Sequence, residues 1–244
     1  IFGIIVLSLN KLTIVIPTKD RTEFVERFLN YYVKTKCIYP FLICDSSNEE
    51  NLSKNIKLIN KYKNLIDIKH IYRENTDNFK ASGWQEDILL KNIFEYIKTE
   101  YVAFFADDDF AITSNFDKGI DFLENNKNYS FVCGKAYLLS INNKVYGDIN
   151  WIENYKQGSA EEENIYQRLE NYIKNYFVAE YGISRSIQMK ERWKLIFENK
   201  FDNLTSEYFN CFMTIIQGKV KKLDHLFLVR QSHNLMTSRI NLTH

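Results

Sequence analysis

The sequence is poor in the features that mark several common classes of protein. Its four cysteines (Cys37, Cys44, Cys133 and Cys211) show no Cys-x-x-Cys spacing, which argues against a structural zinc site and favours buried free thiols. A formal net charge of +1 gives no general attraction to nucleic acid. With two prolines and eight glycines the chain offers no Pro/Gly linker and no Gly-rich phosphate loop. We therefore expect one continuous core.

The first ten residues are apolar, yet they lack the basic leader and the small-residue cleavage site of a signal peptide. They are also fewer than the roughly 20 apolar residues that a membrane-spanning helix needs. We expect residues 1–10 to form a packed strand or a strand-like extension.

Three consecutive carboxylates, Asp107, Asp108 and Asp109, directly follow an apolar segment over residues 101–106. Such a segment is typical of a buried parallel strand, and open α/β sheets bind ligands at the carboxyl ends of their strands. Adjacent anions repel one another unless a cation offsets the cost. In an extended strand end Asp107 and Asp109 point to the same side, where they can bind a divalent metal and a nucleotide. A solvated acidic turn is the alternative interpretation.

The residues before the aspartates alternate between predicted strands and helices. Strands are predicted over 12–16, 41–44, 66–72 and 101–106, and helices over 23–33, 50–61 and 85–97. This order indicates a parallel, right-handed, doubly wound sheet. After residue 109 the pattern is mixed, with helices predicted over 115–123, 160–176, 189–198 and 206–217, and strands over 130–134, 135–140, 144–149, 219–223 and 226–230.

Several segments, in this order, resemble the family 2 glycosyltransferases of the GT-A fold: residues 13–21, 43–47, 107–109, 206–218 and 229–233. The resemblance covers residues 11–238. It implies an α/β fold of GT-A type, with a mainly parallel doubly wound sheet and a mixed C-terminal half. Residues 1–110 would form the nucleotide-sugar-binding half of one continuous domain, and residues 111–244 its acceptor-binding and catalytic half.

The resemblance also implies an activity, which is the inverting transfer of a sugar from a nucleotide sugar to a hydroxyl of a glycan or lipid-linked acceptor. A UDP-sugar is the favoured donor, and surface polysaccharide synthesis is the expected process. The cytoplasm is the expected compartment, and the resemblance leaves open a peripheral contact with the inner face of a membrane. Mn²⁺ or Mg²⁺ is the implied cofactor, because a metal offsets the charge of the leaving nucleoside diphosphate. No nucleic-acid partner is expected.

By the same resemblance, the nucleotide sugar would contact Thr18, Asp20, Arg21, Asp45, Lys80, Gly83, Asp107, Asp108 and Arg230. The metal would be held by Asp109 and His233, with Asp107 on the ribose, the metal or a metal-bound water. Several of these residues also have a structural interpretation: Asp45 as a turn former, Lys80 as a solvated lysine and Gly83 as a helix-start glycine. Asp20 fits a variant capping box with Glu23, and His233 fits a loop histidine, since the spacing here is Arg-x-x-His where the family commonly has Arg-x-His.

An inverting enzyme needs a carboxylate that takes the proton of the acceptor hydroxyl. The family supplies it from a Glu-Asp pair at the start of the late helix, where this chain has Glu207 followed by Tyr208. Glu207 is the predicted base and Asp202 the alternative. In the alternative, purely structural interpretation, Glu207 is an acid in the first turn of the helix that the helix dipole stabilises.

Other classes of protein share parts of this pattern. A phosphatase of the Asp-x-Asp-x-Thr type would need threonine where Ala111 stands. A nucleotidyltransferase would also bind a metal nucleotide, but the chain has no Gly-rich phosphate loop. A nucleotide- or glycan-binding protein with a degenerate transferase site is compatible with Tyr208.

Overall fold

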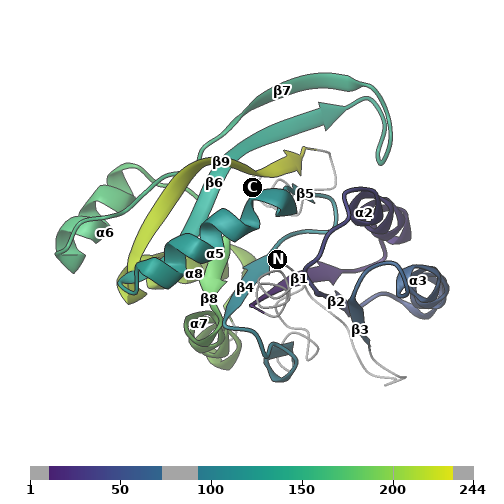
Figure 1. Ribbon diagram of the computed structural model, residues 1–244, viewed down its shortest axis with the longest axis horizontal. Coiled ribbons are helices and arrows are strands. Elements are labelled where there is room, and N and C mark those ends of the chain that lie inside the picture. The colour runs from purple at the N-terminus through teal and green to yellow at the C-terminus, as the bar shows by residue number, and fades with distance from the viewer. Residues whose placement is uncertain (1–10, 73–92, 200, 233–244) are drawn as a thin grey trace, which may run out of the picture.

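The computed structural model describes residues 11–72, 93–199 and 201–232 (Figure 1). Over these residues the strands are β1 (Leu12–Thr18), β2 (Phe41–Asp45), β3 (Ile68–Tyr72), β4 (Tyr101–Phe104), β5 (Phe110–Ala111), β6 (Tyr129–Ile141), β7 (Ile149–Tyr155), β8 (Ile183–Arg185) and β9 (Lys219–Gln231). The helices are α2 (Thr22–Lys34), α3 (Glu49–Tyr62), α5 (Phe116–Asn125), α6 (Ile165–Lys174), α7 (Ser186–Asn199) and α8 (Asn203–Gln217), with short 3-10 turns η2 (Ile93–Glu95) and η3 (Thr113–Asn115).

All nine strands join one sheet, in the order β3-β2-β1-β4-β8-β6-β9-β5, with β7 paired to the outer part of β6. Strands β1 to β4 are parallel, as the alternating pattern predicts. Because β1 and β2 pair with Thr18 opposite Asp45, the carboxyl ends of these strands meet at one edge of the sheet. The polar residues that follow β1, β2 and β4 therefore share that edge.

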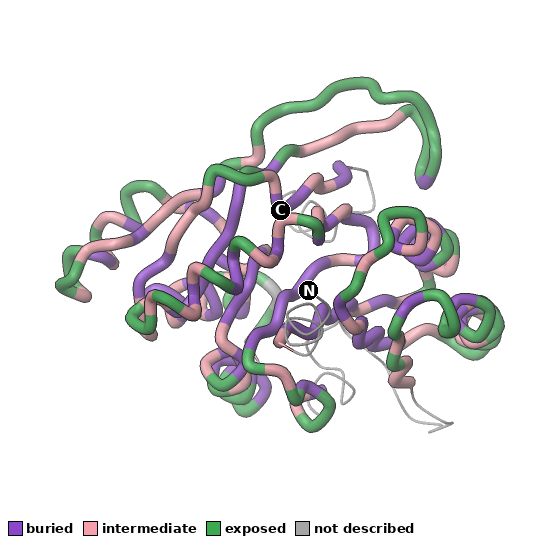
Figure 2. Tube along the Cα trace, in the orientation of Figure 1, coloured by how far each residue is buried: buried purple, intermediate pink, exposed green. Residues whose placement is uncertain are grey.

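Successive residues of the central strands point to opposite faces of the sheet, and both faces are covered. Ile14 belongs to a core that also contains Phe28 of α2 and Ile120 of α5. Val15 belongs to a second core on the other face, with Trp193 of α7. Figure 2 shows the result as a buried sheet beneath helices whose outer surfaces are exposed. The apolar runs of β1 and β4 are continuous because each face needs its own apolar side chains.

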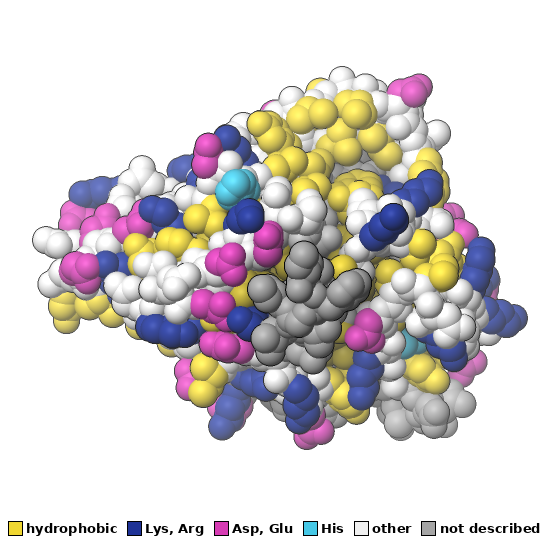
Figure 3. Space-filling model, viewed as in Figure 1, with side chains coloured by type: hydrophobic (Ala, Val, Ile, Leu, Met, Phe, Trp, Pro, Cys, Tyr) yellow, Lys and Arg dark blue, Asp and Glu magenta, His cyan; other side chains and the backbone are white. Residues whose placement is uncertain are grey.

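The second half of the sheet is mixed. Strand β8 runs antiparallel to both β4 and β6, β9 is parallel to β6, and β5 is antiparallel to β9. Strands β6 and β7 form a long hairpin that extends away from the body of the molecule (Figure 1). Apolar side chains gather over this hairpin in Figure 3, and Ile149, Trp151 and Ile152 of β7 are among the exposed ones.

Some predicted boundaries were wrong, each for a local reason. Residues 129–141 form one strand where a break at Gly134 was predicted. That glycine lies at a register irregularity, and a Cβ there would stand 2.3 Å from the His225 carbonyl oxygen. The second strand of the hairpin begins at Ile149 and not at residue 144, because residues 142–148 form its loop.

Strand β1 continues through Pro17, where the prediction ended it. Ile14 donates its N–H toward the β2 side, to the Pro40 carbonyl. By alternation the nitrogen of Pro17 faces the β4 side, where the paired residues end at Val15 and Phe104. The missing N–H of Pro17 therefore removes no bond from the sheet.

Of the helix predicted over 85–97, only the end is described, and it forms the 3-10 turn η2. The predicted extension over residues 1–10 lies outside the described residues. Three of the four free cysteines are buried and Cys37 is partly buried, which agrees with the prediction of unpaired thiols. No helix in the described part of the chain is long and apolar enough to cross a membrane.

Candidate functional site

The three aspartates lie in a turn directly after β4. The N–H of Asp109 donates to the Ala106 carbonyl at 3.2 Å, so the chain turns here where an extended end was predicted. The turn is not solvated either: Asp107, Asp108 and Asp109 are 2%, 6% and 3% exposed. Both the extended geometry and the interpretation as a solvated acidic turn were therefore wrong.

Two predicted residues from the end of β1 contact the first two aspartates. The Thr18 hydroxyl donates to Asp107 Oδ2 at 2.7 Å. Arg21 places one nitrogen 2.9 Å from Asp107 Oδ1 and another 2.6 Å from Asp108 Oδ2. A guanidinium is suited to this bridge because its donors are held in a fixed planar fork. Thr18, Arg21, Asp107 and Asp108 thus form one cluster at the edge of the sheet.

Asp109 has separate partners, which the pairing of β5 with β9 brings close. Its Oδ1 accepts from the backbone N–H of Gln231 at 3.2 Å, and its Oδ2 accepts from Arg230 Nε at 3.2 Å. The same guanidinium donates to the Tyr155 hydroxyl at 2.9 Å and lies 4.2 Å from the ring centre of Tyr181. The predicted Arg230 is therefore held in the site by Asp109 and two tyrosines.

The prediction missed Arg27, a buried residue of α2 that contacts the acidic turn and the end of β9. It donates to the Asp108 carbonyl at 2.6 Å and contacts the Gln231 side-chain oxygen. Arg27 lies on the side of α2 that carries Phe24 and Phe28, where apolar residues are expected. An arginine among the apolar residues of this helix face was the sequence feature that could have indicated a buried, bonded side chain.

The electrostatics of the turn follow from its burial. Burial, together with repulsion from Asp108, raises the pKa of Asp107 to about 6, although Arg21 lowers it. Burial likewise raises the pKa of Asp109 to about 7, although Arg230 opposes the shift. Arg21 and Arg230, with hydrogen bonds from Thr18 and Gln231, favour the charged carboxylates against this burial.

In this arrangement, a divalent cation would have to compete with the protein's own donors for the carboxylates of the turn. In the described part of the chain no three His, Cys, Asp or Glu side chains gather as a metal site. The carboxylate oxygens of Asp107 and Asp109 each already accept a hydrogen bond or ion pair, from Thr18, Arg21, Arg230 or Gln231. A cation at Asp109 would have to displace Arg230, and the predicted ligand His233 lies outside the described residues.

Asp45 ends β2 and is 1% exposed. Its carboxylate accepts from Asn55 at 2.8 Å and lies 3.0 Å from His70 Nε2. Burial would raise the pKa of Asp45, but hydrogen bonds from His70, Ser47 and Asn55 outweigh it, so this pKa lies below its ordinary value. The prediction missed His70, which reaches Asp45 because β3 pairs with β2.

Asp20 does not cap α2, so the capping-box interpretation was wrong. The residue before α2 is Arg21, and no side-chain hydrogen bond caps the helix there. Asp20 adopts a left-handed backbone conformation, with φ of 54°. Its carboxylate accepts from the backbone N–H of Asn48 at 2.8 Å, at the start of α3. Asp20 therefore ties the loop after β1 to the loop after β2.

The two candidate bases lie on α8. Asp202 is the N-cap residue, and its carboxylate accepts from the Thr205 backbone N–H and hydroxyl, both at 2.9 Å. Glu207 lies in the second turn, partly buried, and accepts from the Tyr176 hydroxyl at 3.1 Å. Two other predicted site residues, Lys80 and Gly83, lie outside the described residues.

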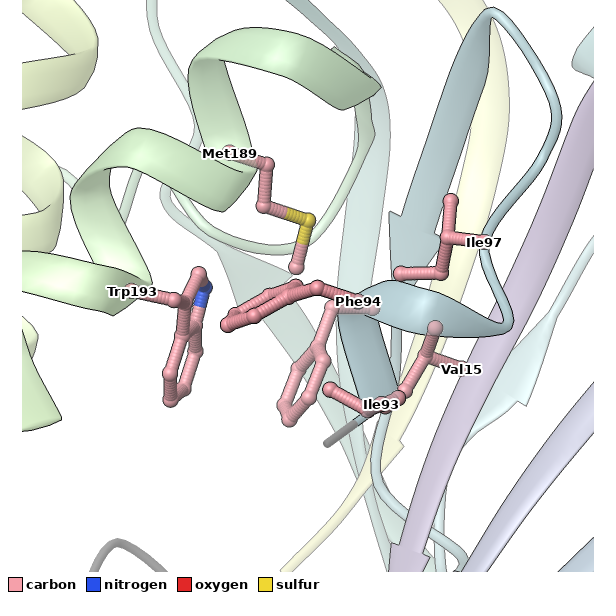
Figure 4. A pocket seen from close by; sticks show the side chains of 7 residues that line it. Val15, Ile93, Phe94, Ile97, Met189 and Trp193 are labelled. Atoms are coloured by element: carbon pink, nitrogen blue, oxygen red, sulfur yellow. The ribbon is translucent and has the colours of Figure 1, made fainter. Parts of the chain in front are cut away.

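An apolar hollow between α7, η2 and β1 is a separate feature, lined by Val15, Ile93, Phe94, Ile97, Phe104, Met189 and Trp193 (Figure 4). None of the predicted site residues lines it. Trp193 is 3% exposed, and its ring centre lies 5.3 Å from that of Phe104. The hollow belongs to the core.

Comparison with known proteins gives likeness of structure without likeness of sequence. No protein-family model matches the chain, and no curated protein matches it. Among solved structures, S. aureus TarS matches with a TM-score of 0.59 at 15% identity, over 91% of this chain and 37% of that one. A structure of TarS 1–349 matches with a TM-score of 0.55 at 16% identity, over 91% of this chain and 60% of that one.

The mannosyltransferase PcManGT from Pyrobaculum calidifontis, solved in complex with GDP-Man and Mn²⁺, matches with a TM-score of 0.53 at 8% identity. That match covers 92% of this chain and 58% of the mannosyltransferase. The chain thus spans less than two thirds of the length of each of these proteins. Together with the strand order, these likenesses show an α/β fold with a mixed, largely parallel sheet that matches the GT-A enzymes.

Proposed function

We propose that the chain is a glycosyltransferase that moves a sugar, with inversion, from a nucleotide sugar to a hydroxyl of a glycan or lipid-linked acceptor. The observation that carries this proposal is the cluster of Thr18, Arg21, Asp107 and Asp108 at the carboxyl edge of a parallel sheet. In open α/β sheets this edge is where ligands bind. A GT-A fold supports a nucleotide-sugar ligand at the same place.

The parallel half, residues 1–110, would bind the donor. Arg21 can offer its fork of donors to the diphosphate, because a planar guanidinium matches phosphate oxygens. Asp45, fixed by Asn55 and His70, is suited to accept hydrogen bonds from the ribose or the base. A UDP-sugar is the first donor to test, and GDP-mannose the second because PcManGT was solved with it.

The second half, residues 111–244, would bind the acceptor and supply the base. During transfer the acceptor oxygen bonds to the anomeric carbon while the bond from that carbon to the diphosphate breaks. The electron pair leaves with the nucleoside diphosphate, and the hydroxyl proton passes to a carboxylate, for which Glu207 is the proposed acceptor. Asp202 stays the alternative, although its carboxylate is engaged in capping α8.

Mn²⁺ or Mg²⁺ is the proposed cofactor, supported by the resemblance and by the Mn²⁺ of PcManGT. The arginine pairs of this chain set a condition on that proposal. A cation would compete with Arg21 for Asp107 and with Arg230 for Asp109. We therefore expect metal affinity to depend on those two arginines.

We place the activity in surface polysaccharide or lipid-linked glycan synthesis at the cytoplasmic side of a membrane. A panel of UDP- and GDP-sugars, incubated with Mn²⁺ and candidate acceptors, tests the activity through release of free nucleoside diphosphate. Arg21→Gln should abolish most of that release, whereas Lys57→Gln, an exposed control on α3, should not. Pyrophosphate release would indicate a nucleotidyltransferase, and donor binding without turnover would indicate a binding protein.

A further inference from the structure

Glu180, just before β8, is bonded to the helix that carries the predicted base. Its Oε1 accepts a hydrogen bond from Asn210 Nδ2 at 3.3 Å. Asn210 follows Glu207 by three residues on α8, and residues at that spacing are neighbours on one side of a helix. The fold thus brings two carboxylates together from segments that are distant in the sequence.

A buried arginine holds Asn210 in the orientation that Glu180 needs. Arg192 of α7 is 1% exposed and donates from Nε to Asn210 Oδ1 at 2.9 Å. Its other nitrogens donate to Gln217 Oε1 at 2.6 Å and to Ser184 Oγ at 3.1 Å. Among the ion pairs found in the described residues none includes Arg192. The amide of Asn210 therefore links this buried cation to Glu180.

Three charged groups from three different elements act on Glu180 electrostatically. They are Glu207 of α8, Arg192 of α7 and Arg230 of β9. Burial raises the pKa of Glu180 to about 7, and repulsion from Glu207 adds to that shift while Arg230 and Arg192 oppose it. The adjacent Tyr181 carries the Arg230 guanidinium on its ring, and Arg230 binds Asp109. The segment of Glu180 and Tyr181 therefore lies between Arg230, which binds the acidic turn, and Asn210 of the helix that carries Glu207.

We propose that Glu180 is the second carboxylate of the proton-accepting site and that it acts with Glu207 as a coupled pair. It would take the place of the acid that Tyr208 replaces in the late helix. The pair takes up the one proton that leaves the acceptor hydroxyl as the new bond to the anomeric carbon forms and the nucleoside diphosphate departs. This role rests on the proposed function, but the coupling of the two carboxylates does not.

The first experiment measures coupling without any substrate. Carboxyl titrations of ¹³C-glutamate-labelled protein by NMR would assign Glu180 through its loss in Glu180→Gln. We expect Glu180 to titrate near pH 7 and to shift downward by about one unit in Glu207→Gln, because a like charge is removed. Glu170→Gln, an exposed control on α6, should leave it unchanged. A Glu180 titration that is indifferent to Glu207→Gln overturns the pair.

The second experiment measures transfer by Glu180→Gln, Glu207→Gln and the double variant. Glutamine keeps the oxygen that Asn210 binds, so the melting temperature at pH 6 should hold. For Glu180→Gln we expect kcat to fall by about 10- to 100-fold with the donor KM unchanged, within the range of general acid–base effects. Groups that act as a unit give a double variant no slower than the slower single one. Losses that multiply would overturn the proposal, whereas absence of transfer by the parent protein would reject the proposed function and leave the titration as the test.

Discussion

Arg27 donates a hydrogen bond at 2.9 Å to the carbonyl oxygen of Val145, which lies 118 residues further along the chain. The same guanidinium donates to the Asp108 carbonyl and contacts the side chain of Gln231. One residue of α2 therefore holds the loop of the β6–β7 hairpin, the acidic turn and the end of β9 together. Arg27 therefore links the half predicted to bind the donor to the half predicted to bind the acceptor.

Replacing Arg27 with methionine should destabilise the whole site. The variant keeps an apolar stem but leaves two buried carbonyl groups without their donor, so we expect the free energy of unfolding to fall by about 3 kcal/mol. Urea denaturation would measure this. Lys34→Met, at the exposed end of the same helix, is the matched control and should change stability little. Equal stabilities for the two variants would contradict the bridging role of Arg27.

The parallel half of the fold was predictable because its signals are local. Apolar runs such as that of β4 and the apolar stripe of α2 each identify an element without knowledge of the rest of the chain. The long strands β6 and β9 were less predictable, since Gly134 interrupts the apolar pattern without ending the strand. A bulge depends on the neighbouring strand, which sequence spacing does not reveal.

In the candidate site, too, some residues could be predicted from the sequence and others could not. Thr18, Arg21 and the aspartates could be grouped because they follow strands whose ends must meet at one edge. Glu180 could not, because its partner Asn210 lies 30 residues away and is itself held by Arg192 of a third element. The arginine partners of the aspartates were also unforeseen in part: a metal was expected to offset charges that Arg21, Arg27 and Arg230 offset in the structure.

Asp109→Asn should flatten the dependence of stability on pH. Burial raises the pKa of Asp109 from 3.8 to about 7. The native state therefore binds more protons than the unfolded state between about pH 4 and pH 7, and this carboxyl's stabilisation, complete below that window, is lost as the pH rises through it. Denaturation of both proteins at pH 5 and pH 8 would show a smaller difference for the variant. We expect its activity to be lost and its stability at pH 8 to match or exceed the parent's; an unfolded variant would make the aspartate structural.

Arg230→Gln should strengthen the binding of Mn²⁺. In the parent protein a cation must displace the guanidinium from Asp109, and a hydrogen bond between charged groups contributes about 1.5–3 kcal/mol. We expect affinity for Mn²⁺ to rise by about tenfold, which corresponds to roughly 1.4 kcal/mol. Electron paramagnetic resonance of free Mn²⁺ measures it directly. Adding Asp109→Asn should remove the gain, and a gain that survives this second change would place the cation elsewhere.

The variants Glu207→Gln and Asp202→Asn distinguish the two candidate bases, because the two carboxylates make different hydrogen bonds in the structure. Glu207 accepts a hydrogen bond from Tyr176, which glutamine can also accept, so the variant should fold and bind donor as the parent does. Its transfer rate should fall by about 10²–10⁴, the usual contribution of general acid–base catalysis. Asp202 caps α8 through two bonds to Thr205, so Asp202→Asn, which keeps an accepting oxygen, should lower the melting temperature slightly and leave the rate nearly unchanged. Steady-state kinetics at saturating donor would show the contrast. If Asp202→Asn loses transfer while Glu207→Gln retains it, the base is Asp202, and if both retain it, the proton leaves through another group or through water.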